Sequence, residues 1–84
     1  MPMNDFMEMF VKANELMPLH LDIYYSENLG WCIAVWRTFT KCNQKFVTVR
    51  NHDMNKAYAE AYDCLFEWYV HQERRAKGGT EQGV

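Results

Sequence analysis

Three cysteines and three histidines are the residues of this 84-residue chain that could serve as nucleophile and base. A catalytic cysteine needs a base within hydrogen-bond distance. A cysteine and a histidine could meet in space, but nothing in their spacing indicates that they do. Cys32 and Cys64 fall on strand and helix positions that usually hold small buried side chains. We therefore predict thiols of the core, no catalytic residue and no enzyme activity.

The same side chains would be the ligands of a structural zinc site. Such sites are marked by close ligand pairs such as Cys-x-x-Cys, and no two cysteines or histidines are that close here. A phosphate-binding loop is not indicated either, because Gly30 stands alone and Gly78-Gly79 lies near the C-terminus. We predict no metal site and no cofactor.

Two segments have apolar residues at helical spacing and would form the helical layer. The first is predicted over Asp5–Met17, with Asp5 and Glu8 as a capping box. Pro18 should end it, because proline disfavours helical geometry in the residue before it.

The second helix should be capped by Asn51 or Asp53 and run to about Glu73 or slightly beyond. Gly78-Gly79 is expected to stop it. The predicted core stripe of this helix is Met54, Ala57, Ala61, Cys64, Leu65 and Trp68.

Between the helices the apolar period changes to two, which predicts three strands, near 20–25, 31–39 and 45–50. Gly30 can take a positive φ in the first turn. Both connections are too short for a parallel crossover, so the strands should form an antiparallel meander. The buried face of the third strand stays open, because Phe46 and Val47 point to opposite faces in a regular strand.

The predicted fold class is α+β, a two-layer α/β sandwich in the order α-β-β-β-α, with both helices on one face of a three-stranded antiparallel sheet. Residues 1–77 would form a single domain and residues 78–84 a flexible C-terminal tail. The element order is that of a double-stranded-RNA-binding domain, a similarity of topology that does not by itself imply a function.

The overall charge argues against a nucleic-acid partner. The formal net charge is -2 and the isoelectric point about 5.8, whereas phosphate binding usually shows as a basic excess. No apolar run reaches bilayer length, and the N-terminus lacks the basic and apolar regions of a signal peptide. The odd, widely spaced cysteines indicate reduced thiols in a cytosol.

Surplus aromatic surface is the strongest functional indication. If the strands bury Ile33 and Val35, then Tyr24 and Trp36 face outward on a sheet face that no helix covers. Exposed tryptophan and tyrosine are typical anchors of protein interfaces. We expect an interface with another protein or with a second copy of the chain.

The second helix adds further candidates for the same protein interface. Its aromatic arc, which includes Tyr62, is wider than one sheet face requires. Glu60, Asp63 and Glu67 follow at i, i+3 and i+7 and would form an acidic ridge. The alternative for the ridge is a plain solvated face.

A nucleic-acid-binding domain is the alternative function. Arg37, Lys41, Lys45 and Arg50 cluster around the second hairpin and could bind a phosphate backbone. Basic residues on an edge strand also prevent aggregation. A double-stranded-RNA-binding domain is expected to carry several lysines at the start of its second helix, where this chain has Lys56 beside Asp53.

One resemblance gives context. The run 31–36, the triplet Asn51-His52-Asp53 and the run 57–68 resemble small accessory proteins of phages and mobile elements of Gram-positive bacteria, over about residues 5–71. The resemblance implies a binder of a bacterial host protein in the host cytoplasm. Such binders include inhibitors of defence systems such as CRISPR nucleases. The resemblance does not identify an activity or catalytic residues.

Overall fold

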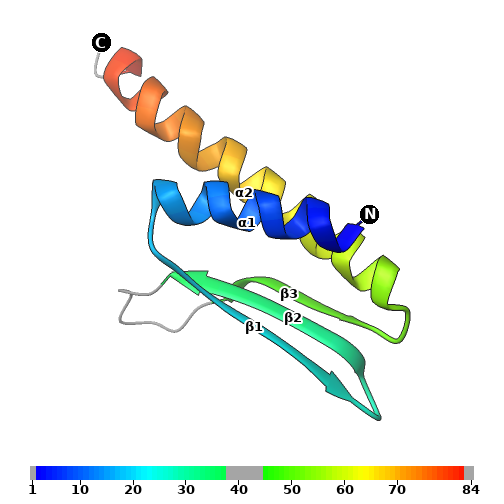
Figure 1. The fold of residues 1–84 in the computed structure, drawn as a ribbon. Helices are drawn as coiled ribbons and strands as arrows, with labels where there is room; N and C mark the ends of the chain where they lie inside the picture. The colour runs from blue at the N-terminus through cyan, green and yellow to red at the C-terminus, as the bar shows by residue number, and fades with distance from the viewer. Residues whose placement is uncertain (1, 38–44, 83–84) are drawn as a thin grey trace.

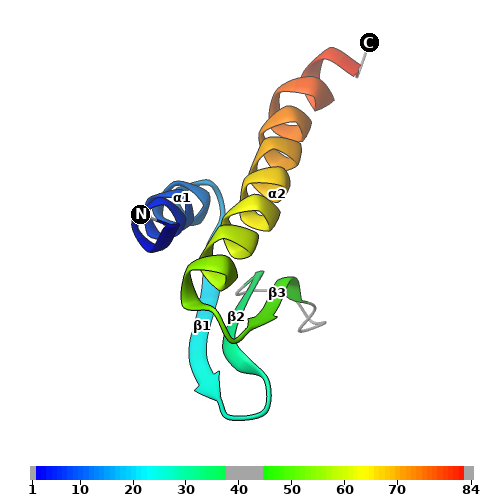
Figure 2. The same cartoon turned by 90° about the vertical axis from the view of Figure 1, so that its right-hand side faces the viewer.

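The fold is an α+β sandwich of two helices on a three-stranded antiparallel sheet, as predicted. The computed structural model describes residues 2–37 and 45–82, with side chains described as far as residue 75. The elements are α1 (Pro2–Leu16), β1 (Leu19–Ser26), β2 (Gly30–Arg37), β3 (Lys45–Asn51) and α2 (Met54–Gln82). Figures 1 and 2 show both helices on the same side of the sheet, whose strand order is β1-β2-β3.

The core lies between the sheet and α2. Ala57, Ala61 and Leu65 recur every four residues along α2 and are fully buried against β2 and β3. α1 packs mainly on α2 and contributes Phe6, Met9 and Ala13 to the same core. Small alanines let the helix backbone approach the strands closely, and the burial of each large apolar side chain contributes about 1.5–3 kcal/mol.

α1 begins three residues earlier than predicted. Pro2 occupies the first turn, where its missing N–H and its fixed φ are compatible with a helix. Asp5 is therefore inside the first turn, and the predicted capping box of Asp5 and Glu8 is wrong. The helix ends at Leu16, ahead of Pro18, as predicted. Asn14 Oδ1 then accepts a 2.9 Å hydrogen bond from the Leu19 N–H and joins the helix end to β1.

Asp53 caps α2, one of the two predicted possibilities. Its Oδ1 accepts a hydrogen bond from the Lys56 N–H at 3.1 Å, and Asn51 Oδ1 accepts one from the Asp53 N–H at 2.9 Å. The predicted stop at Gly78-Gly79 is wrong, because α2 continues to Gln82. Glycine costs a helix about 1 kcal/mol relative to alanine, but unlike proline it keeps the backbone hydrogen bond. The flexibility predicted for 78–84 stays a prediction.

Two members of the predicted core stripe of α2 are exposed. Cys64 and Met54 both face solvent. The helix meets the sheet along the row through Ala57, Ala61 and Leu65, and Cys64 falls on the acidic side of that row. The prediction of buried thiols is therefore correct for Cys32 and wrong for Cys64.

A β-bulge settles which face β3 buries. Val35 pairs with Val47, but Trp36 pairs with Lys45, so Phe46 is the extra residue of the bulge. Val47 is fully buried in the core. The Phe46 ring instead stacks on Trp68 of α2, with centroids 4.3 Å apart and planes 9° from parallel. Both Phe46 and Val47 thus pack on the helical layer, which a regular strand would not allow.

None of the helices formed by residues 2–37 and 45–82 combines the length and the apolar character that crossing a membrane requires.

The turn between β1 and β2 depends on Gly30. This residue has φ = 82° and sits against the junction of β3 and α2. A Cβ at Gly30 would lie 2.6 Å from the backbone nitrogen and the Cα of His52. Positive φ alone costs a side-chain-bearing residue roughly 1–2 kcal/mol, and the contact with His52 adds to that cost.

We expect Gly30→Ala to lower the free energy of unfolding by at least about 2 kcal/mol, measured by urea denaturation followed by circular dichroism. Glu27→Ala, at an exposed position in the same turn, is the matched control and should change it by less than about 0.5 kcal/mol. Equal midpoints for the two variants would contradict this account of the turn.

Candidate functional site

The candidate site is the sheet face opposite the helices, called the open face below. Side chains alternate along a strand, and directly paired residues of neighbouring strands share a face. The pairing therefore defines three rows across β1, β2 and β3 on this side. The rows are His20–Trp36–Lys45, Asp22–Ala34–Thr48 and Tyr24–Cys32–Arg50. Figure 2 shows that neither helix covers this side.

Trp36 is the centre of the first row and is held by both neighbouring strands. From β1 the His20 ring stacks on the indole, with centroids 4.3 Å apart and planes 21° from parallel. From β3 the Lys45 Nζ lies 5.3 Å from the indole centroid, a cation–π distance. Trp36 is consequently half-buried although no helix covers it. These two contacts set the orientation of the indole.

Tyr24 is the exposed aromatic residue of the open face, with 54% of its surface accessible. Its hydrogen bond with Cys32 is the main cause that raises the pKa of the phenol, and the positive charge of Arg50 opposes the shift. Because the ordinary value is already about 10, the phenol is neutral at physiological pH. Tyr24 thus offers a ring and a hydroxyl to a partner.

The charge of the open face is mainly positive. Lys45 and Arg50 are exposed on β3. The carboxylate of the face is Asp22, whose Oδ1 lies 3.7 Å from His20 Nε2. Cys32 and Ala34 in the middle strand are small and buried between larger neighbours. The open face therefore carries aromatic and cationic side chains on either side of small, buried residues in the middle strand.

The structure unites residues that the sequence analysis assigned to two different functions. Tyr24 and Trp36, predicted for protein binding, share the open face with Lys45 and Arg50, predicted for nucleic acid. Arg37 is elsewhere: it pairs with Leu19 on the helix-facing side. There Arg37 lines a hollow with Leu16, Met17, Gln72 and Arg75. Lys41 lies outside the described residues.

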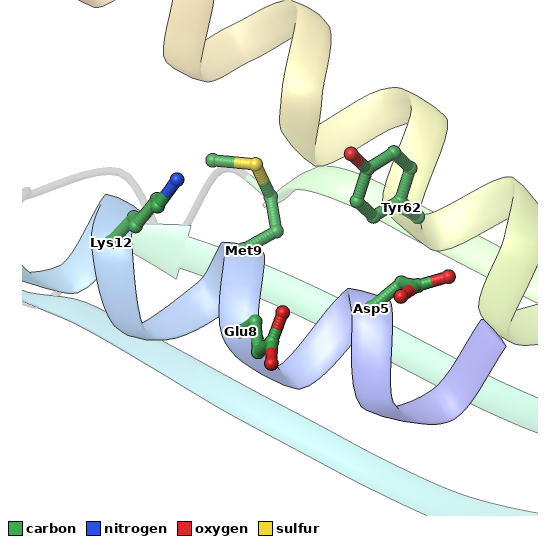
Figure 3. A pocket seen from close by; sticks show the side chains of 5 residues that line it. All are labelled: Asp5, Glu8, Met9, Lys12 and Tyr62. Atoms are coloured by element: carbon green, nitrogen blue, oxygen red, sulfur yellow. The ribbon is translucent and has the colours of Figure 1, made fainter. Parts of the chain in front are cut away.

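The α2 candidates do not join the open face. Tyr62 is half-buried, and its ring is parallel to that of Phe66, with centroids 6.0 Å apart. Figure 3 shows Tyr62 facing α1 across a small open pocket. The α1 residues that line this pocket are Asp5, Glu8, Met9 and Lys12.

The predicted acidic ridge is on another side of α2. Glu60, Asp63 and Glu67 are exposed, and Glu60 Oε1 accepts a 3.2 Å hydrogen bond from Asn51 Nδ2 at the end of β3. Partial desolvation, and then repulsion by Glu67, Asp63 and Glu60, raise the pKa of the Cys64 thiol. The ridge is thus a coherent acidic surface, separate from both Tyr62 and the open face.

The open face presents aromatic rings, cations and a hydroxyl, groups that can stack, form ion pairs and form hydrogen bonds. Within residues 2–37 and 45–75, no group of three or more His, Cys, Asp or Glu side chains could hold a metal ion. The sequence did not indicate His20 as a site residue, because its contact with Trp36 depends on strand register.

The acidic ridge leads to a prediction about thiol chemistry. A raised pKa leaves less Cys64 thiolate at a given pH, so alkylation by iodoacetamide should be slower than for an ordinary thiol, whose pKa is about 8.5. In a Cys42→Ser background, Glu67→Gln should move the pH midpoint of the alkylation rate downward, as measured by intact mass. Glu73→Gln, on the same helix, is the control and should leave the midpoint in place. An unchanged midpoint in Glu67→Gln would contradict the repulsion by the ridge.

Comparisons with known proteins do not extend this picture. No protein-family model, curated protein or solved structure matches the chain. The resemblance to phage and mobile-element proteins therefore stays a prediction, and the residues of the open face carry the functional argument.

Proposed function

We propose that this chain is a non-enzymatic protein-binding module that acts by covering a site on its partner with the open face. The observation that carries the proposal is Trp36, held between His20 and Lys45 on a sheet side that neither α1 nor α2 covers. A side chain ordered before binding loses little conformational freedom when the complex forms. Tryptophan, tyrosine and arginine dominate the binding energy of protein interfaces, and Trp36, Tyr24 and Arg50 supply all three.

The charges indicate what kind of protein surface would fit. Lys45 and Arg50 favour a partner that presents carboxylates around an apolar centre, because complementary charge speeds association and sets orientation. The resemblance described above adds the context of a bacterial host protein, such as a defence nuclease that an inhibitor blocks by occlusion. Under this proposal the module works in the host cytoplasm.

A protein partner is favoured over stacked bases by the surroundings of Trp36. His20 and Lys45 approach the flat surface of the indole from the two neighbouring strands. Stacking on a base needs an unoccupied aromatic face, whereas a protein contact can use the indole edge and its N–H.

Two adjacent tyrosines allow a matched test. Tyr24 and Tyr25 are both 54% exposed, but Tyr24 is on the open face and Tyr25 packs edge-on against Trp31 on the other face. A partner is first captured with tagged protein from a Gram-positive bacterial lysate treated with nuclease, and its affinity is then measured by calorimetry. We expect Tyr24→Ala and Trp36→Ala to weaken binding about 10- to 30-fold and Tyr25→Ala to leave it within about twofold.

Circular dichroism and unfolding midpoints verify that all three variants fold. Equal losses for Tyr24→Ala and Tyr25→Ala, or binding retained by Trp36→Ala, would exclude the open face as the contact surface.

Single-stranded nucleic acid is the second candidate, and the shared face favours it over the duplex binding suggested by topology. Aromatic rings interleaved with cations are typical of single-strand platforms, and Tyr24 lies in one row with Arg50. If this candidate is correct, labelled oligonucleotides should bind with an affinity that falls steeply as salt rises.

Charge reversal tests the second candidate. The double variant Lys45→Glu/Arg50→Glu should abolish oligonucleotide binding, and fluorescence anisotropy at low salt measures it. Replacement of the ridge residue Glu67 by Gln is the control and should have no effect. Wild-type protein that leaves oligonucleotide anisotropy unchanged at low salt would remove this candidate.

A further inference from the structure

The two edges of the sheet differ in how they are protected. An edge strand presents unpaired backbone N–H and C=O groups, which proteins guard with charge, proline or bulges. β3 has Lys45, Arg50 and the bulge at Phe46. β1 is an eight-residue edge strand without Lys, Arg or Pro, and its pairing with β2 runs without a register shift. The outer edge of β1 is therefore suited to accept another strand.

The helix-facing side of β1 is also incompletely covered. Leu21 and Ile23 point toward the helical layer with the core residues Val35 and Ile33, yet both are only half-buried. The reason is that α1 packs mainly on α2 rather than on the sheet. Apolar surface thus continues from the core to the free edge of β1.

α1 extends this apolar surface. Met3, Met7 and Val11 form one row along the helix, and Val11 is 55% exposed. Counted from Met7, this row is about 100° around the helix from the core residue Phe6, and about 140–160° from the pocket residues Asp5 and Lys12. It therefore projects away from α2. Figure 2 shows α1 above β1, beside α2 on the same side of the sheet.

The polar residues of β1 match a second copy of the same strand. In an antiparallel pair centred on Leu21, His20 lies opposite the partner's Asp22, and Asp22 opposite the partner's His20. Leu19 then lies opposite the partner's Ile23 on the helical side. A pair centred on Asp22 would place two carboxylates opposite each other, which is unfavourable. A pair centred on Ile23 would place no imidazole opposite Asp22.

We propose that two copies of this chain pair antiparallel through the free edge of β1, with Leu21 on the two-fold axis. The pairing is isologous, as in most homodimers. It joins the two sheets into one and pairs the free backbone N–H and C=O groups of the β1 edge. It also places the Met3–Met7–Val11 rows of both copies on the same side of the joined sheet, near the two-fold axis. The two open faces become one surface with two Trp36 side chains, whether or not that surface binds a partner.

The mass of the wild-type chain in solution is the first test. Sedimentation equilibrium over a concentration series, with a reductant present to exclude disulfides, should show a monomer–dimer equilibrium. A single-chain mass up to the highest soluble concentration would overturn the proposal.

Charge variants then test the register. His20→Asp puts two carboxylates opposite each other, and Asp22→Lys puts a cation opposite His20, so each should raise the dimer dissociation constant at least about tenfold. The double variant His20→Asp/Asp22→Lys places opposite charges across the axis and should recover most of the loss. Absence of that recovery would overturn the register centred on Leu21.

The α1 row is tested separately. Val11→Lys should weaken the dimer about tenfold or more, while Ala59→Lys, at an exposed position on α2, is the matched control and should not. Both variants should keep the wild-type circular dichroism spectrum, since both positions are exposed. A dimer that persists unchanged in Val11→Lys and in both single charge variants would show that another surface holds it, and would overturn the proposal.

Discussion

The burial of Ile33 and Val35 against α2 is the constraint on which the other features depend. Both residues come from the middle strand, and both are almost completely removed from solvent. Because side chains alternate along a strand, this burial places Trp36 on the opposite side of the sheet. The pairing with β1 and β3 then brings His20 and Lys45 to the same row. The composition of the open face is thus a consequence of how the core packs.

The bulge at Phe46 changes which residue of β3 meets Trp36. Without it, the pairing of Val35 with Val47 would continue to Trp36 with Phe46, and the open face would carry two large rings side by side. With it, Lys45 lies over the indole and Phe46 stacks on Trp68 of α2. One extra residue therefore exchanges an apolar surface, prone to aggregation, for an aromatic ring paired with a cation. The Phe46–Trp68 stack also packs β3 against the middle of α2.

The parts that sequence reasoning predicted correctly depend on local pattern. Alternation in β2 identified the outward side of Trp36, Gly30 marked the turn, and Asp53 was one of two predicted caps. The parts that it missed depend on tertiary contacts. The position of Lys45 follows from the Phe46–Trp68 stack, and the contact of His20 with Trp36 needs the register of two strands. Cys64 is exposed because α2 faces the sheet along the row of Ala57, Ala61 and Leu65, which is rotated slightly from the stripe that periodicity predicted.

The separation of charge over the surface explains why net charge is a poor guide to the partner here. A formal charge of -2 argues against phosphate binding only if the charges are mixed. In the structure, Lys45 and Arg50 are on the open face, whereas Glu60, Asp63 and Glu67 are on α2. Each surface therefore has its own sign, and each would orient an approaching partner differently. The accessibility of the aromatic rings is a second constraint that total charge does not report. At Trp36, the His20 ring and the Lys45 Nζ from the two neighbouring strands already lie against the indole.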